Sequence, residues 1–200
     1  MKGKNTLGLT GKNVDLLIIF SHYPDFREIL TALIDEERPD DKCVDILKAK
    51  SDAYRLQIRL ADTRNFVARF VMHRILTSRS WVQLKKTFEI FEEIYGTTFE
   101  QRMSRVFKGD YRDTLKAIYQ YAMDSNTFFA MALHRDLDSF HSVGKWGGTY
   151  GVSRVFTWRS EIDLGDIAAA FLKKYKRSLE NYVKSEVRGW AKTALVAILN

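Results

Sequence analysis

Four histidines are the side chains best suited to acid–base catalysis in this 200-residue chain: His22, His73, His134 and His141. None of them has a serine or cysteine partner at the spacing of a known catalytic motif, so the sequence does not support a catalytic triad. No phosphate loop of the G-x-x-x-x-G-K-[ST] or G-x-G-x-x-G type occurs, which leaves nucleotide binding without a motif. We predict that the protein is not an enzyme.

Two pairs of neighbouring carboxylates are the other candidates for acid–base chemistry. They are Asp136 with Asp138, and Glu161 with Asp163. Acidic side chains at such positions are common as surface charges and as caps of helices. We interpret all four in that way.

The most informative pattern is an internal repeat, because positions 75–118 recur at 155–198 with a constant offset of 80 residues. A third, partial copy at 25–33 matches 110–118 at an offset of 85. The residues that recur at the first offset include Thr77, Arg79, Ser80, Leu84, Phe91 and Leu115, which return as Thr157, Arg159, Ser160, Leu164, Phe171 and Leu195. Self-similarity at a fixed period predicts stacked supersecondary units.

The repeated unit has the pattern of an all-α structure. Apolar residues from Leu84 to Phe107 are spaced by three or four positions, and long alternating strand patterns are nearly absent. Ser80, Asp163 and Ser178 are candidate N-caps, and Gly109 and Gly189 separate successive helices. We predict four or five helices per unit, with both copies of the recurring leucines and phenylalanines buried.

Composition limits the setting and the partners. One cysteine, Cys43, excludes an internal disulfide, and no Cys/His cluster has zinc-ligand spacing, which fits a reducing, cytoplasmic setting. A net charge of +7 favours anionic partners such as lipid headgroups or acidic filaments, although a solvated basic surface explains the charge equally well. Nucleic acid is not expected, because RNP-like aromatic strings and GXXG loops are missing.

The repeats resemble those of a known family. The segments 75–88 (ILTSRSWVQLKKTF) and 155–164 (VFTWRSEIDL) resemble the second helix of annexin repeats, and 95–118 and 175–198 resemble the fourth and fifth helices. The resemblance covers nearly the whole chain. It implies an all-α fold of annexin-like repeats, each with five helices wound into a right-handed superhelix.

A typical annexin has four repeats, so this chain resembles a C-terminal portion, truncated at the N-terminus. The resemblance implies that residues 1–35 are a partial repeat, residues 36–50 a linker, and residues 51–124 and 125–200 two whole repeats. The incomplete repeat predicts an apolar face of Val14, Leu17, Ile18, Ile29 and Leu33 that is partly exposed or that drives self-association.

The resemblance also implies a calcium site. In annexins a glycine-rich loop between the first two helices supplies carbonyl oxygens and a later acidic side chain completes the site, as calcium requires six to eight oxygens. In the last repeat the loop is 142–149. The implied ligand region comprises Ser142, Gly144, Trp146, Gly147 and the acid Glu186. The glycine spacing is imperfect, because Trp146 takes the second glycine position and Gly147 follows one place late. A loop without an ion is the alternative.

The repeat 51–124 has lost these features. Its loop, around 63–67, contains no glycine, and its acidic position is Val106. At most one calcium site of this type is therefore expected. Arg79 and Arg159, which are tempting as lipid ligands, are placed by the resemblance inside the repeats as partners of a buried acid.

Two functions follow from the resemblance. The first is calcium-dependent binding to anionic phospholipid by a cytoplasmic protein that is peripheral on membranes. The alternative is a calcium-independent, annexin-derived scaffold that binds cytoskeletal or other protein partners. Glu186 with its glycine-rich loop favours the first function, and Val106 with its glycine-free loop favours the second.

Overall fold

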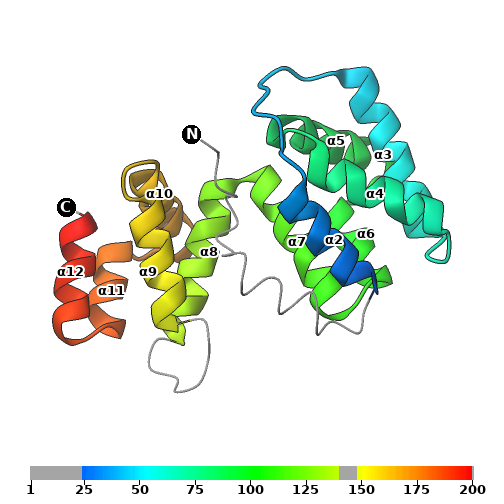
Figure 1. Ribbon diagram of the computed structural model, residues 1–200. Helices are drawn as coiled ribbons and strands as arrows, with labels where there is room; N and C mark the ends of the chain where they lie inside the picture. Colours follow the sequence, from blue (N-terminus) through cyan, green and yellow to red (C-terminus); the bar gives the residue numbers. More distant parts are fainter. Residues whose placement is uncertain (1–23, 140–147, 200) are drawn as a thin grey trace. The chain divides into compact units, whose positions relative to one another are not determined.

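The computed structural model describes residues 24–139 and 148–199, and these residues form helices without a single strand (Figure 1). The chain divides into two compact units, residues 1–123 and 124–200. Each unit contains a set of five consecutive helices. The predicted all-α fold with five helices per repeat is confirmed.

The first unit begins with α2 (Pro24–Asp35), which precedes the five-helix set. That set comprises α3 (Ile46–Ala61), α4 (Phe66–Ser78), α5 (Trp81–Tyr95), α6 (Phe99–Val106) and α7 (Gly109–Met123). Helix α3 begins earlier than the linker 36–50 predicts, because the side chain of Asp45 caps it by accepting a hydrogen bond from the Lys48 backbone amide at 2.9 Å.

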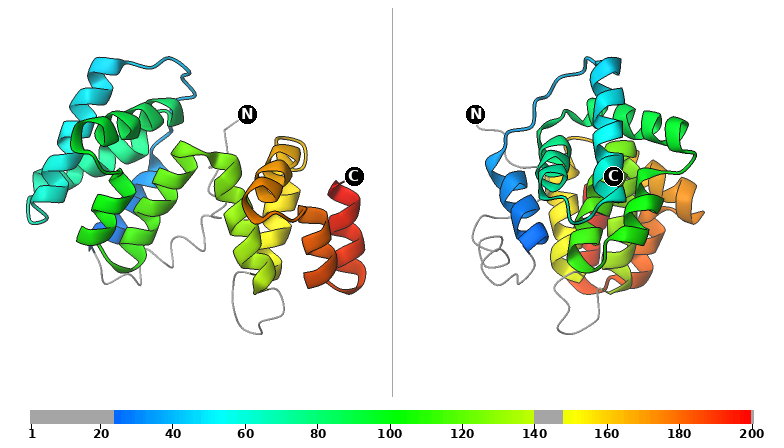
Figure 2. Two further views of the ribbon diagram at one scale, coloured as in Figure 1. Left: turned by 180° about the vertical axis from the view of Figure 1, so that it is seen from behind. Right: turned by 90° about the vertical axis from the view of Figure 1, so that its right-hand side faces the viewer.

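The second unit repeats this order. Its helices are α8 (Ser125–Asp138), α9 (Gly148–Arg159), α10 (Leu164–Tyr175), α11 (Leu179–Glu186) and α12 (Gly189–Leu199). Helices α6 and α11 have the same length and begin and end 80 residues apart. Figure 2 shows both units from two further sides.

The helix starts follow from their capping side chains. Ser80 accepts a hydrogen bond from the Gln83 amide at 3.3 Å, and Ser178 accepts one from the Asn181 amide at 3.2 Å, which confirms both predicted N-caps. Asp163 stands at the N-cap of α10 without a side-chain cap bond. Its carboxylate pairs with Arg159 instead.

The same turn ends α5 and α10 but is built from different residues. Gly96 and Lys176, which are 80 positions apart, both adopt left-handed backbone conformations, with φ of 65° and 57°. Glycine takes this conformation freely, whereas a side chain raises its energy by about 1–2 kcal/mol. Among the described residues, Lys176 is the only non-glycine residue with positive φ.

We expect Lys176→Gly to raise the free energy of unfolding of the second unit by about 1 kcal/mol, because the strain at this C-cap disappears. The greater flexibility of glycine in the unfolded chain offsets part of the gain. Denaturant titration measures the change. Lys174→Gly, inside the last turn of α10, is the matched control and should lower stability by about 1 kcal/mol. A loss of stability in both variants would contradict the assignment of strain to Lys176.

The recurring apolar residues form the two cores, as predicted. Leu84, Phe91 and Leu115 are buried in the first unit, and Leu164, Phe171 and Leu195 are buried in the second. In the first unit an aromatic group lies at the centre. Its members are Phe88, Phe91, Phe99 and Tyr119, with ring centroids 5.0–6.3 Å apart. Such pairs add about 0.5–1.5 kcal/mol each beyond the burial of their area.

The prediction of a partly exposed N-terminal apolar face is wrong for Ile29 and holds for Leu33. Ile29 is fully buried and Leu33 is partly buried, because α2 packs against α4 and α7 within the first unit. The other members, Val14, Leu17 and Ile18, lie outside the described residues. The five-helix set therefore supplies packing partners for α2 without a second copy of the chain.

Candidate functional site

Four helix ends gather at one end of the second unit. Helix α8 ends at Asp138, α9 begins at Gly148, α11 ends at Glu186 and α12 begins at Gly189. Figure 1 and the left view of Figure 2 show these ends pointing the same way. The predicted loop ligands lie between the first two of these ends and outside the described residues: Ser142, Gly144, Trp146 and Gly147.

A stacked polar cluster fixes the end of α8 against α11. The hydroxyl of Tyr182 donates a hydrogen bond to Asp138 Oδ1, and His134 Nδ1 lies 3.1 Å from Asp138 Oδ2. The His134 ring stacks on Tyr182 and on Tyr175, with centroids 5.0 and 4.0 Å apart. Burial, and then the hydrogen bond to Asp138, raise the pKa of Tyr182. Because Tyr182 precedes Glu186 by one helical turn, this cluster holds the end of α8 close to the part of α11 that carries the acid.

Glu186 is the predicted acid, and it is the last residue of α11. Its side chain is half-buried, and Oε1 accepts a hydrogen bond from Ser185 Oγ at 3.0 Å. Within residues 24–139 and 148–199 it forms no ion pair, and no three potential metal-ligating side chains come together there. Glu186 is therefore a carboxylate without a cationic partner in the described part of the chain. A calcium site that combines one carboxylate with backbone carbonyl oxygens needs such an unpaired carboxylate.

A second carboxylate at this end is structural. Asp136 is 4% exposed, which corrects its interpretation as a surface charge, whereas Asp138 and Glu161 are exposed as expected. Its carboxylate packs directly on Gly151 in the first turns of α9, where a Cβ atom would stand 1.9 Å from Oδ2. The N-terminal end of a helix favours a negative charge, so Asp136 ties α8 to α9 next to the loop.

The recurring arginines differ between the units. Arg79 Nε lies 2.6 Å from Asp52 Oδ2, and Asp52 is 1% exposed, which confirms a buried structural pair. Arg159 Nε lies 2.7 Å from Asp163 Oδ1, but this acid is only partly buried and lies four residues along the chain. Both arginines are held by carboxylates, and neither is free to bind lipid phosphate.

The corresponding loop of the first unit, between α3 and α4, is closed by a side-chain cation. Arg59, in the last turn of α3, is 2% exposed. Its Nη1 donates to the carbonyl oxygens of Asp62, at 3.4 Å, and of Thr63. Its Nη2 lies 3.1 Å from Asp25 Oδ2, and its guanidinium carbon lies 5.2 Å from the centre of the Phe107 ring. Loop carbonyls thus face a guanidinium group that belongs to the protein.

The acid position of this unit adds no ligand. Val106 ends α6, as Glu186 ends α11, and its side chain is partly buried against the apolar core. Sequence reasoning found the missing glycines and Val106 but did not predict Arg59. An arginine near the end of an amphipathic helix, on its apolar face, is the signal that was available.

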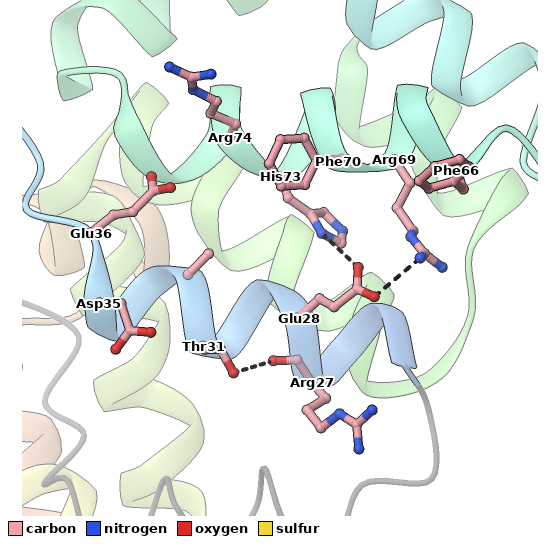
Figure 3. Close-up of a pocket in the computed structure, with 11 residues that line it drawn as sticks. Arg27, Glu28, Thr31, Asp35, Glu36, Phe66, Arg69, Phe70, His73 and Arg74 are labelled. Carbon is pink, nitrogen blue, oxygen red and sulfur yellow. Dashed lines mark hydrogen bonds and ion pairs between the residues drawn. The ribbon is translucent and has the colours of Figure 1, made fainter.

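A groove lies between α2 and α4, and the sequence analysis did not predict it. It has a volume of about 530 Å³, and Figure 3 shows Glu28 on one wall facing His73 and Arg69 on the other. Glu28 Oε1 lies 3.1 Å from Arg69 Nη2, and Oε2 lies 3.7 Å from His73 Nδ1. His73 Nε2 lies 2.8 Å from the Tyr111 hydroxyl. Burial lowers the pKa of His73 to about 4, although the carboxylate of Asp25 acts in the opposite direction.

This pKa predicts a loss of stability in mild acid. The ordinary pKa of histidine is about 6.5, so between about pH 6.5 and pH 4 the unfolded chain binds a proton that the folded chain does not. Stability that is present at pH 7 should therefore fall with pH by about 3 kcal/mol. Urea titrations across this range should show a flatter pH dependence for His73→Gln than for the native chain. Equal slopes would contradict the assignment.

Comparison with known proteins gives a single family. The annexin family model matches residues 51–118 and 151–198. Annexin A3 of Mus musculus is 32% identical over 176 residues, which are 87% of this chain and 52% of that protein. Annexin A13 of Mus musculus is 28% identical over 176 residues, covering 88% of this chain and 54% of that protein. The chain spans about half the length of the curated relatives it matches.

Solved structures agree with the sequence comparison. Annexin III matches with a TM-score of 0.78 and 31% identity, covering 91% of this chain and 55% of that structure. Calcium-bound annexin (Sm)1 matches with a TM-score of 0.75 and 29% identity, covering 92% and 52%. Since the family model spans over half of the chain and the helices follow those of solved annexins, this chain belongs to the annexin family.

Proposed function

We propose that the chain binds phospholipid membranes peripherally, in the cytoplasm, and that calcium bound in its last repeat strengthens this binding. The observation that carries the proposal is the position of Glu186, an unpaired carboxylate in the described residues, at the end of the unit where the loop 140–147 begins and ends. Family membership and the calcium-bound annexin neighbour support it. No helix among residues 24–139 and 148–199 is long and apolar enough to cross a bilayer.

The proposed set of oxygen ligands is suited to binding calcium with modest affinity. Glu186 supplies two oxygens if it binds through both, and carbonyls near Ser142, Gly144 and Gly147 supply about three more, so water or a lipid phosphate completes six to eight ligands. Trp146 lies in the same loop and contributes a backbone carbonyl or an indole at headgroup depth. One charged ligand places the affinity without lipid at about 10⁻⁴–10⁻³ M.

The first unit is not proposed as a calcium site. Arg59 faces the carbonyls of its loop, and Val106 stands where an acid is needed. This observation favours the second candidate function, a calcium-independent scaffold for cytoskeletal or other protein partners. The two functions differ in whether calcium changes vesicle binding.

We expect Glu186→Gln to abolish the calcium-stimulated part of co-sedimentation with phosphatidylserine-containing vesicles, because an amide cannot provide a charged, bidentate ligand. Binding in the presence of a chelator should be unchanged. Glu180→Gln, which removes the same charge from the same helix, is the control and should keep the calcium response. A full response in Glu186→Gln would show that the site is elsewhere, and no response in the native chain would favour the scaffold.

A further inference from the structure

A groove between α11 and α12 is lined by both positively charged and apolar side chains. Its volume is about 470 Å³, and it is lined by Lys184 of α11 and by Lys192, Thr193, Val196 and Ala197 of α12. The two helices pack side by side in Figures 1 and 2. Two ammonium groups, a hydroxyl and the methyl groups of valine and alanine line the same groove, and they suit a ligand that has an anionic head and an apolar body.

The cations around this groove are largely available. Lys184 Nζ lies 2.5 Å from Glu180 Oε1, but the lysine side chain is half exposed, and surface pairs of this kind are weak. Lys192 and the exposed Arg188 form no ion pair within the described part of the chain. The α11–α12 corner therefore presents three cations, of which one is held by a surface carboxylate.

Trp190 lies in the same helix as Lys192 and is largely in water. Its side chain is 86% exposed, more than any other large apolar side chain that the structure describes. It lies in the first turn of α12, between Arg188 and Lys192 in sequence. An indole left in water forgoes the free energy of burial, and the interface between headgroups and acyl chains is the environment that suits both its ring and its N–H group.

We propose that Lys184, Arg188, Trp190 and Lys192 form a calcium-independent contact with the surface of an anionic phospholipid bilayer. The cations bind lipid phosphates and carboxylates, and Trp190 enters the headgroup layer. The contact rests on the proposed phospholipid function but uses no residue of the proposed calcium site. It gives the last repeat two means of attachment, of which only one responds to calcium.

Charge variants test the contact in the presence of a chelator. Vesicles of phosphatidylcholine with phosphatidylserine should bind the native chain, and vesicles of phosphatidylcholine alone should not. The double variant Lys184→Gln/Lys192→Gln should lower the partition coefficient by roughly 30-fold, as expected for two cations near an anionic surface. Lys173→Gln/Lys174→Gln on α10 removes the same charge from exposed positions outside the groove and should cause a much smaller loss.

Tryptophan fluorescence tests the orientation. Addition of the anionic vesicles should shift the emission of the native chain to shorter wavelength, and Trp190→Phe should remove most of that shift. Trp158→Phe, which changes a half-exposed tryptophan on α9, should retain it. Both variants alter exposed side chains, so circular dichroism and thermal melts should match those of the native chain.

Three results would overturn the contact: no binding of the native chain without calcium, equal losses in the two double lysine variants, or an unchanged emission shift in Trp190→Phe. If the native chain does not bind vesicles without calcium but still binds them with calcium, the contact is contradicted and the proposed function is not. Conversely, chelator-resistant binding that depends on Lys184 and Lys192, with no calcium response, would support the contact and contradict the calcium site.

Discussion

Arg59→Met should lower the free energy of unfolding of the first unit by about 3 kcal/mol. The substitution removes a buried cation that pairs with Asp25 and donates to the carbonyls of the loop between α3 and α4. Breaking a buried pair from one side typically costs about 3–5 kcal/mol. The lower end applies here, because Arg69 Nη1 still lies 2.8 Å from Asp25 Oδ1, and methionine fills much of the space.

Arg55→Met is the control for this experiment, since Arg55 lies one turn earlier on α3 and is exposed. Both variants remove one positive charge from the same helix, but only the first removes the cation from the loop. Denaturant titration followed by circular dichroism measures both. Equal, small losses in the two variants would contradict the role of Arg59 as the cation that closes the loop.

Phe91→Ala and Phe171→Ala should each lower the free energy of unfolding of their unit by about 3–5 kcal/mol, the usual cost of truncating a buried phenylalanine. Both side chains are fully buried. Phe91 packs on Tyr95 and Phe99, with centroids 4.8 and 5.8 Å apart, and Phe171 packs on Tyr175 and Tyr182 at 4.8 and 5.4 Å.

The matched control for these variants is Phe70→Ala on α4, where the side chain is 63% exposed. It should change stability by less than about 0.5 kcal/mol, as surface substitutions usually do. Because the chain has two compact units, unfolding is best followed through calorimetric transitions, which separate units that unfold independently. A loss below about 1 kcal/mol for either buried phenylalanine would contradict the assignment of these residues to equivalent cores.

Periodicity was enough to predict the helical units, because the apolar spacing and the caps are local properties of the sequence. Ser80 and Ser178 cap the helices where their side chains predict it, and α6 and α11 keep the 80-residue offset at both ends. The offset fails where the loops differ. Helices α4 and α9 begin 82 residues apart, at Phe66 and Gly148.

Contacts between helices that are distant in sequence were not predictable in the same way. The sequence pattern around Arg59 does not indicate that Asp25 is its partner. The burial of Ile29 likewise depends on α4 and α7, which come much later in the chain. The sequence predicts Asp136 as a surface charge, whereas its burial depends on close packing against Gly151 of the next helix, which has no side chain. Such features follow from packing, which a periodic pattern does not specify.

The candidate site was predictable only in part. Glu186 follows from the repeat offset, and the structure places it at the end of α11. Its relation to α8 depends on Tyr182, Asp138 and His134, whose cluster has no sequence motif. The predicted loop residues Ser142, Gly144, Trp146 and Gly147 lie outside the described residues, so their part in calcium binding stays a prediction.

The number of calcium ions bound per chain tests the central proposal most directly. Equilibrium dialysis with phosphatidylserine-containing vesicles, corrected for the calcium that the vesicles bind alone, measures it. The proposal predicts one ion per chain, which Glu186→Gln should remove, and no second ion in the first unit, where Arg59 faces the loop. Two ions per chain, or none at millimolar calcium, would contradict it.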